Sequence, residues 1–334
     1  MDFLKDIVKE IGDDYTQLAR DIDGEERYID TGSFIFKGLV SGSIYGGVST
    51  NKITAIAGES STGKTFFSLA VVKNFLDSNP DGYCLYFDTE SAVNKGLLES
   101  RGIDLTRLVV VNVVTIEEFR TKALKAVDKY LQMPTEDRKP CMLVLDSLGM
   151  LSTEKEIRDA LDDKQVRDMT KSQLVKGAFR MLTLKLGQAN VPLIDTNHTY
   201  DVIGAYVTTK EMGGGSGLKY AASTIIYLSK KKEKDGKEVI GNIIKAKTHK
   251  SRLSKENKLV EIRLYYDDRG LDRYYGLLEL GEIGGLWKND AGRYEINGKK
   301  IYAKQILAQP DTYFTPEVMQ ALDEIAAKEF SYGE

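Results

Sequence analysis

Hydrophobic runs alternate with amphipathic stretches over roughly residues 50–200 of this chain. The runs have the length of strands but lack the polar alternation of a strand with one face in water. The stretches between them have helical spacing. Strands are predicted over residues 52–58, 83–88, 108–114, 141–146 and 191–197, and helices over 64–77, 116–131 and 169–187. This α/β pattern predicts a mostly parallel sheet with helices on both faces.

Beyond residue 220 the hydrophobic runs follow one another without intervening helices. Residues 222–229 and 239–247 flank an Asp-Gly pair, a strong turn signal, and predict a β-hairpin. Another strand is predicted over 258–266. These strands are expected to extend the sheet in antiparallel fashion, with Lys230, Lys231 and Lys232 at the solvated tip of the hairpin.

The pattern divides the chain into three predicted parts. An N-terminal segment, 1–30, begins with an amphipathic helix over 1–22. That helix could dock on its own domain or on a neighbouring subunit. An α/β core spans 31–275, and a small C-terminal domain spans 276–334 with a last helix over 316–330.

Composition narrows the function classes. The net charge is −3, so any nucleic-acid site must be a local basic patch or consist of backbone amides. The acidic amphipathic start is unlike a signal peptide, and no hydrophobic run approaches the ~20 residues of a membrane helix. Cys84 and Cys141 lie in strand-like runs and are expected to be buried free thiols, which fits a reducing cytoplasm. Cysteine and histidine are too few and too scattered for a metal site of their own.

One segment matches the phosphate-binding pattern G-x-x-x-x-G-K-[ST]. Its residues are Gly58, Glu59, Ser60, Ser61, Thr62, Gly63, Lys64 and Thr65. The glycines let backbone N–H groups point at phosphate oxygens, and the following helix adds its positive end. In such loops the lysine reaches the β- and γ-phosphates and the hydroxyl residue binds Mg²⁺. Because a predicted strand precedes the loop and a predicted helix follows it, we predict a site for ATP and Mg²⁺.

Three more polar residues end predicted parallel strands and should share one sheet edge with this P-loop. Asp146 could hold a Mg²⁺-bound water or cap the next helix. Glu90 could activate the attacking water or be an N-cap carboxylate for a helix beginning near Ala92. His198 could sense the γ-phosphate or be a structural histidine. The P-loop favours the functional interpretation for Asp146 and His198 and leaves both open for Glu90.

Two features could contact DNA. A glycine-rich segment has unobstructed backbone N–H groups that could grip a phosphodiester, although it could also be a flexible linker. Its residues are Gly213, Gly214, Gly215 and Ser216. Because it follows the strand of His198, γ-phosphate contact could order it. Lys176 and Arg180 lie one turn apart on a predicted helix and are further candidates.

A basic cluster lies further along the chain. Its members Lys250 and Arg252 could bind DNA, or phosphate on another subunit's nucleotide. The sequence alone leaves both possibilities open.

These motifs, in this order and spacing, resemble those of RecA-family recombinases. The segments that carry the resemblance are GESSTGKT, FDTES, LVLDSLG, DTNHTY, and MGGGSGLKYAAS followed by AKTHKSR. They are more similar to the UvsX recombinases of large tailed bacteriophages than to bacterial RecA, which has glutamine where this chain has His198. The resemblance covers roughly residues 28–280.

The resemblance implies an ATP-dependent recombinase that forms helical filaments on single-stranded DNA and exchanges strands with a homologous duplex. It assigns water activation to Glu90, γ-phosphate sensing to His198, and contact with a neighbouring protomer's nucleotide to Lys250 and Arg252. It matches residues 153–169 and 199–217 to two DNA-binding loops, places Lys176 and Arg180 at or near phosphate contacts, and gives Tyr220 a relay role. It also implies a recombination mediator, a single-strand-binding partner, and the cytoplasm of an infected bacterium.

Two positions depart from the family pattern. Leu97 stands where bacterial RecA stacks an aromatic ring on adenine, and Asn94 stands where a carboxylate usually holds the base. Looser base selectivity is therefore expected. Since one ATPase fold serves several functions, a hexameric DNA motor or helicase and a nucleotide-dependent scaffold without strand exchange remain the alternatives.

Overall fold

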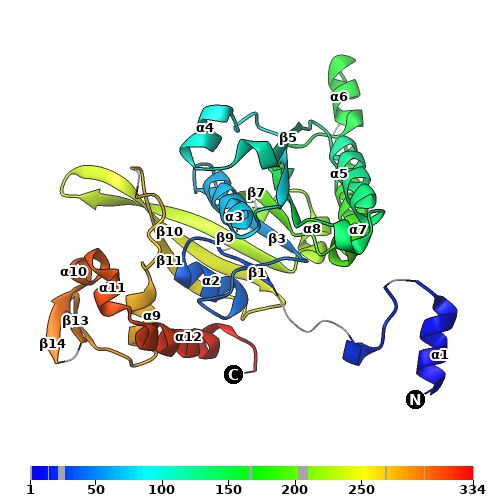
Figure 1. Cartoon of the computed structure of the whole chain (residues 1–334). Coiled ribbons are helices and arrows are strands. Elements are labelled where there is room, and N and C mark those ends of the chain that lie inside the picture. Colours follow the sequence, from blue (N-terminus) through cyan, green and yellow to red (C-terminus); the bar gives the residue numbers. More distant parts are fainter. Residues whose placement is uncertain are drawn as a thin grey trace.

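The computed structural model describes residues 2–13, 15–21, 27–164, 168–201, 210–267, 269–296 and 298–333. Within these residues, the central element is a nine-stranded sheet with the order β11-β10-β9-β3-β7-β6-β4-β5, and with β8 paired to β7. The parallel strands are β3 (Ile53–Gly58), β4 (Tyr83–Asp88), β5 (Leu108–Asn112), β6 (Cys141–Asp146) and β7 (Leu193–Asp201). β9 (Thr224–Asp235) runs parallel to β3 and antiparallel to β10 (Glu238–Ser251), which pairs with β11 (Leu259–Tyr265). The predicted fold class, an α/β core with an antiparallel extension, is confirmed (Figure 1).

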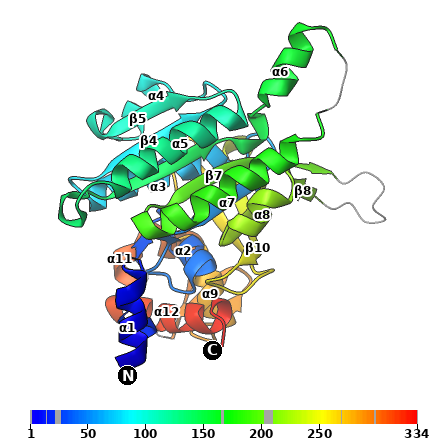
Figure 2. The same cartoon turned by 90° about the vertical axis from the view of Figure 1, so that its right-hand side faces the viewer.

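Helices cover both faces of the parallel strands, as Figure 2 shows. Alternate strand residues face opposite helices. Ile56, Tyr86 and Val144 pack in the cluster that contains α3 (Lys64–Ser78). The opposite face packs against α5 (Ile116–Leu131) and α7 (Lys171–Ala189), through Phe87, Leu143 and Leu145. Burial on both faces explains why these strands have continuous hydrophobic sequences.

One buried residue breaks this apolar pattern. Asp195 of β7 is fully buried, and among the described residues neither of its carboxyl oxygens has a hydrogen-bond partner. Burial, and then the charge of Asp146, raise the pKa of Asp195 well above its ordinary value. The folded protein therefore holds this carboxyl in its protonated form over a range of pH in which the unfolded chain ionises it.

We expect Asp195→Val to stabilise the protein by about 2 kcal/mol at neutral pH, because it removes a buried polar group without partners. The raised pKa means that parental stability falls as pH rises above about 3.9, by up to ~1.4 kcal/mol per pH unit, until the folded pKa is passed. Urea unfolding at pH 5 and pH 8 should therefore show a larger gain at pH 8. Asp195→Asn is the matched control, since it removes the pH dependence but keeps a buried amide. A gain independent of pH would contradict the assignment.

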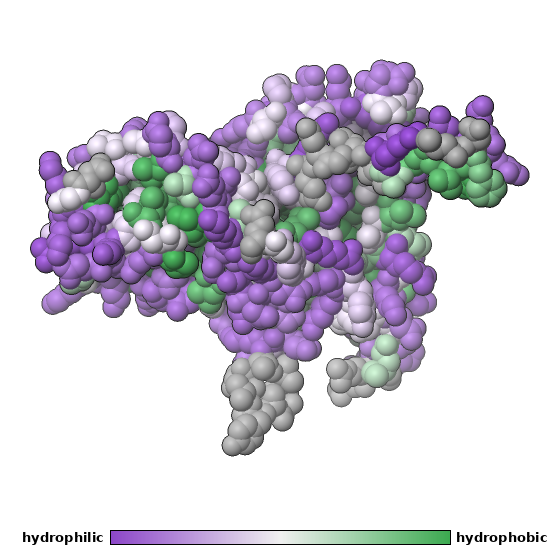
Figure 3. All heavy atoms as spheres, turned by 90° about the horizontal axis from the view of Figure 1, so that it is seen from below, coloured by the Kyte–Doolittle hydropathy of each residue, from purple (hydrophilic) through white to green (hydrophobic). Residues whose placement is uncertain are grey.

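The N-terminal helix is shorter than predicted. Helix α1 spans Asp2–Ile11 rather than 1–22, because Gly12 adopts a left-handed φ of 64° and Asp13 accepts bonds from the Tyr15 amide and the Thr16 hydroxyl in a tight turn. The helix stands away from the sheet (Figures 1 and 2), and its Phe3 side chain is 73% exposed. Figure 3 shows hydrophobic residues gathered on this protruding arm. The expected apolar stripe is thus present but uncovered by the described residues.

The hairpin lysines are also placed differently from the prediction. Lys230, Lys231 and Lys232 lie within β9, opposite Ile244, Ile243 and Asn242 of β10, and the turn comes later, at Gly236. The prediction of a lysine-tipped turn was wrong because the strand pairing continues well beyond the hydrophobic run.

The C-terminal part packs on the core. It consists of α9 (Leu277–Ile283), β12 (Asn289–Asp290), β13 (Arg293–Ile296), β14 (Lys299–Tyr302), α10 (Ala303–Ala308), α11 (Pro310–Tyr313) and α12 (Pro316–Phe330). Asp323 of α12 accepts bonds from the Ser43 hydroxyl and the Ile44 amide, next to α2 (Phe34–Ser41). One hydrophobic cluster joins α2, α9 and α12, so the predicted boundary at 275 crosses a continuous core and the three-part division stays a prediction. In the described parts of the chain, no helix is long and apolar enough to cross a membrane.

Candidate nucleotide and DNA site

The P-loop joins β3 to α3 in the tight conformation that its glycines predict. Gly63 has a φ of 94°, and a Cβ at Gly58 would lie 2.6 Å from the Thr62 hydroxyl. The Lys64 amine donates to the carbonyls of Gly58 (3.1 Å) and Glu59 (2.9 Å), so it lies over the loop that it is expected to serve. Burial lowers the pKa of Lys64, while the charges of Glu90 and Asp146 oppose this.

One hollow brings together the residues predicted at this edge. It is lined by Ser60, Ser61, Gly63, Lys64, Thr65, Phe66, Glu90, Asp146 and His198. The register of the strands explains why these residues lie together, because Asp88 is paired with Asp146 and Gly58 with His198 across neighbouring parallel strands. The residues fit a nucleoside triphosphate with Mg²⁺, since they offer loop amides for the phosphates, the positive charge of Lys64, and oxygen ligands for the metal.

Asp146 is held rigidly at the end of β6. Its side chain is buried and accepts hydrogen bonds from the hydroxyls of Tyr86 (2.6 Å) and Thr196. Burial, and then the charge of Asp146, raise the pKa of Tyr86 far above its ordinary value, so Tyr86 remains a donor. Thr65 lines the same hollow, and the pair supplies the hydroxyl and carboxylate oxygens that Mg²⁺ prefers when phosphates complete its shell. Sequence reasoning missed Tyr86 and Thr196.

Glu90 faces the hollow rather than capping a helix. Its carboxylate accepts from the Ser147 hydroxyl (2.8 Å) and lies 3.1 Å from His198 Nε2. Burial raises the pKa of Glu90, but the bonds from Ser147 and His198 outweigh burial, and the pKa lies below its ordinary value. Glu90 is therefore ionised at neutral pH, as a general base must be. The next helix begins at Lys95 rather than near Ala92, and Asp88 accepts from the Glu90 amide at 3.0 Å in the turn that follows β4.

The predicted base-recognition residues lie outside the hollow. Helix α4 spans Lys95–Ser100, and Asn94 is its N-cap, with its amide oxygen accepting from the Leu97 amide at 3.0 Å. Leu97 packs partly buried against the core. Their role toward the base stays a prediction.

Lys250 and Arg252 also lie outside the described hollow of their own chain. Lys250 donates to the carbonyls of Lys219 (2.6 Å) and Ala222 (2.8 Å), at the C-terminal end of α8 (Ser216–Ala221). Burial, and then the Arg252 charge, lower the pKa of Lys250. Arg252 reaches the Tyr220 carbonyl at 3.4 Å. The basic pair thus holds the helix that follows the glycine-rich segment.

The glycine-rich segment is tied to the strand of His198. The Gly213 amide donates to the His198 carbonyl at 3.0 Å, and the Asn197 amide donates to the Gly213 carbonyl at 3.0 Å. Gly214 and Gly215 have left-handed φ values of 82° and 73°, which only glycine adopts freely. The segment is therefore bonded to the strand of His198, while its role, in DNA binding or as a linker, stays a prediction.

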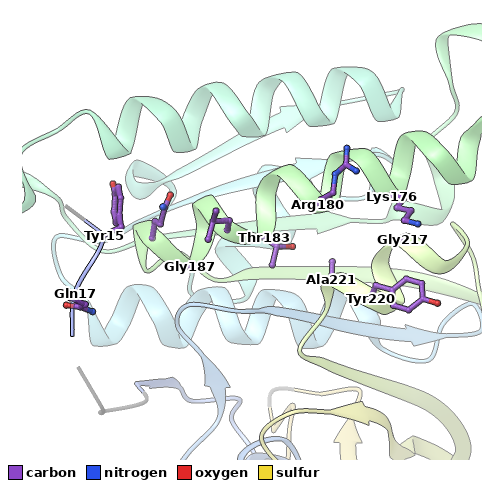
Figure 4. Close-up of a pocket in the computed structure, with 11 residues that line it drawn as sticks. Tyr15, Gln17, Lys176, Arg180, Thr183, Gly187, Gly217, Tyr220 and Ala221 are labelled. Atoms are coloured by element: carbon purple, nitrogen blue, oxygen red, sulfur yellow. The ribbon is translucent and has the colours of Figure 1, made fainter. Parts of the chain in front are cut away.

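The predicted basic residues of α7 line a groove of about 940 Å³ beside this segment. Figure 4 shows Lys176 and Arg180 along α7, with Gly217 and Tyr220 on the neighbouring α8 and Tyr15 from the N-terminal arm. Of the two expected DNA loops, residues 165–167 and 202–209 lie outside the described residues. DNA contact at Lys176, Arg180 and the Gly213–Ser216 segment stays a prediction.

Comparison with known proteins places the chain in a family. Residues 2–272 match the RecA N-terminal domain family. The chain is 34% identical over 283 residues to the "Recombination and repair protein" of Enterobacteria phage T4, covering 83% of this chain and 70% of that protein. It is 26% identical over 290 residues to protein RecA of Corynebacterium urealyticum, covering 86% of this chain and 75% of that relative. The chain therefore belongs to the RecA family, as its motifs predict.

Proposed function

We propose that this protein is an ATP-dependent homologous recombination protein, which pairs single-stranded DNA with a homologous duplex and exchanges the strands. The observation that carries the proposal is the direct connection between two sites. His198 contacts Glu90 in the nucleotide hollow with its side chain, and its backbone carbonyl holds Gly213 of the proposed DNA-binding segment. A change at either site can therefore reach the other through one residue.

The residues of the hollow have separate tasks in hydrolysis. Lys64 and the loop amides would bind and orient the phosphates, while Thr65 and Asp146 would hold Mg²⁺, which would neutralise charge on the phosphates. Glu90 accepts a proton from the attacking water, and Ser147 and His198 fix the orientation of its carboxylate. We assign γ-phosphate sensing to His198.

Assembly into a filament is supported by the arm and by the basic pair. Helix α1 exposes Phe3, Leu4 and Ile11, which a neighbouring subunit could cover. Lys250 and Arg252 lie away from their own P-loop, and in a filament they would reach a neighbour's nucleotide. The sequence of DNA would be recognised by base pairing, so backbone contacts by Lys176, Arg180 and the glycine-rich segment suffice.

The proposed protein partners rest on the family resemblance. We propose that a recombination mediator and a single-strand-binding protein act with this protein, and that it works in the cytoplasm of an infected bacterium. The phage relative supports this setting.

The proposal predicts ATP hydrolysis that single-stranded DNA stimulates, and filaments in negative-stain images. In Glu90→Gln, hydrolysis should fall about a hundredfold, because glutamine keeps the shape but is a poor base. Its filaments should then persist longer in ATP. Glu99→Gln, an exposed glutamate that pairs with Lys95, is the matched control. Closed rings would favour the hexameric motor, and hydrolysis indifferent to DNA would favour the scaffold. Loss of ATP binding in Glu90→Gln would make Glu90 structural.

A further inference from the structure

An ion pair joins the P-loop to β8, the short strand that leads into the glycine-rich segment proposed to bind DNA. The short strand β8 (Lys210–Met212) pairs with β7 in an antiparallel ladder that sets Lys210 opposite Asp201. The Lys210 amine contacts the carboxylate of Glu59, the second residue of the P-loop. Asp201 lies farther from the same amine, at 4.0 Å. The family roles account for His198 on β7 but leave this contact from β8 unexplained.

Glu59 is well placed to influence the catalytic lysine. Its backbone carbonyl accepts from the Lys64 amine (2.9 Å) and from the Thr62 hydroxyl (2.9 Å). For Lys64 to reach a phosphate, it must exchange this carbonyl for phosphate oxygens. A shift of the Glu59 side chain therefore moves the residue whose carbonyl accepts from the Lys64 amine.

A second lysine from the sheet also contacts the P-loop, but in a different way. Lys230 of β9 donates to the Ser61 carbonyl at 2.6 Å, so it grips backbone. The Lys210 contact is between two side chains, and Lys210 lies on β8, directly before the segment proposed to bind DNA. A displacement of β8 would therefore break the Lys210–Glu59 pair and leave the Lys230 contact from β9 in place.

We propose that Lys210 is a positioning residue of the ATPase, whose ion pair with Glu59 transmits DNA binding from β8 to the P-loop. This inference rests on the proposed DNA-stimulated hydrolysis. The His198 connection runs along β7, so β7 and β8, the two strands that flank residues 202–209, both contact the nucleotide site. The side chains are 41% and 61% exposed, so the pair is weak enough to be broken and remade as DNA binds.

The test is a charge swap, with ATP hydrolysis measured with and without saturating single-stranded DNA. Lys210→Glu and Glu59→Lys should each reduce the stimulation by DNA about two- to fivefold, the range that an exposed ion pair can transmit. The double variant Lys210→Glu/Glu59→Lys should recover most of it. The two single changes have opposite effects on DNA attraction, so weaker DNA binding cannot explain a loss common to both.

Lys73→Glu is the matched control. Lys73 pairs with Asp77 on the surface of α3, and the two side chains are 41% and 53% exposed, close to the values for Lys210 and Glu59. The change alters net charge as Lys210→Glu does and should leave the stimulation unchanged. Single variants that keep full stimulation, or a double variant no better than the worse single one, would overturn the inference alone. A parent protein without DNA stimulation would overturn it together with the proposed function.

Discussion

Replacing Lys64 with alanine is expected to reduce ATP hydrolysis by more than about a thousandfold, with or without DNA. The lysine charge is the one that the P-loop brings to the β- and γ-phosphates, and a preorganised charge on a buried side chain such as Lys64 has a large effect on the transition state. The position is specific, because the amine already lies over the carbonyls of Gly58 and Glu59. A phosphate-release assay at saturating ATP measures the loss.

The same change should alter the pKa of Glu90, the proposed general base. The Lys64 charge is one of the influences that lower the pKa of Glu90, so this pKa should rise in Lys64→Ala. Lys73→Ala, on the same helix but at the surface, is the control and should hydrolyse ATP at the parental rate. Circular dichroism separates lost catalysis from lost folding. Near-parental turnover in folded Lys64→Ala would exclude the P-loop as the ATP site.

The sheet and the hollow could be predicted from the sequence because burial on both faces leaves a strong pattern. β4 and β6 have the predicted ranges, Tyr83–Asp88 and Cys141–Asp146. Once the strands are parallel, their carboxyl ends meet, and Glu90, Asp146 and His198 must lie near the P-loop. Topology alone therefore brought together residues that lie far apart in the sequence.

The partners of these residues could not be predicted in the same way. Ser147, Tyr86 and Thr196 act through single hydrogen bonds to residues 50 or more positions away along the chain, and no periodicity records such a bond. The pair Lys210–Glu59 has the same origin, since both side chains are exposed and look like ordinary surface charges. A weak signal existed for Tyr86 and Thr196, since each is a hydroxyl in a mostly apolar strand, but the sequence does not pair either of them with Asp146.

The early end of α1 has a local cause that the hydrophobic spacing conceals. The apolar stripe continues at Tyr15 and Leu18, but Gly12 and Asp13 terminate the helix before these residues are reached. A spacing argument counts hydrophobic positions and gives too little weight to one glycine. The consequence is a helix that ends at Ile11 and leaves its apolar side chains exposed, which suits contact with another subunit.

The basic pair should have effects as large as those of Lys64 if it completes a neighbour's active site. Lys250→Ala and Arg252→Ala should each keep ATP binding in the isolated subunit but lose DNA-stimulated hydrolysis by about a thousandfold or more, as when a charge supplied by another subunit is removed. The structure adds a complication, because Lys250 also holds the end of α8 through carbonyl bonds. Arg252 makes one long bond there, at 3.4 Å, so Arg252→Ala is the cleaner variant.

Mixing Arg252→Ala with Lys64→Ala separates the two roles. Each variant supplies the half-site that the other lacks, so interfaces between an intact P-loop and an intact basic pair should restore part of the hydrolysis. Lys255→Ala removes the same charge nearby without touching α8, since Lys255 bonds to the Lys328 carbonyl, and should retain activity by itself. If filaments that demonstrably contain both variants remain inactive, the basic pair acts within its own subunit. Its contact with α8 would then be its main function, and assembly would have to stimulate hydrolysis by another route.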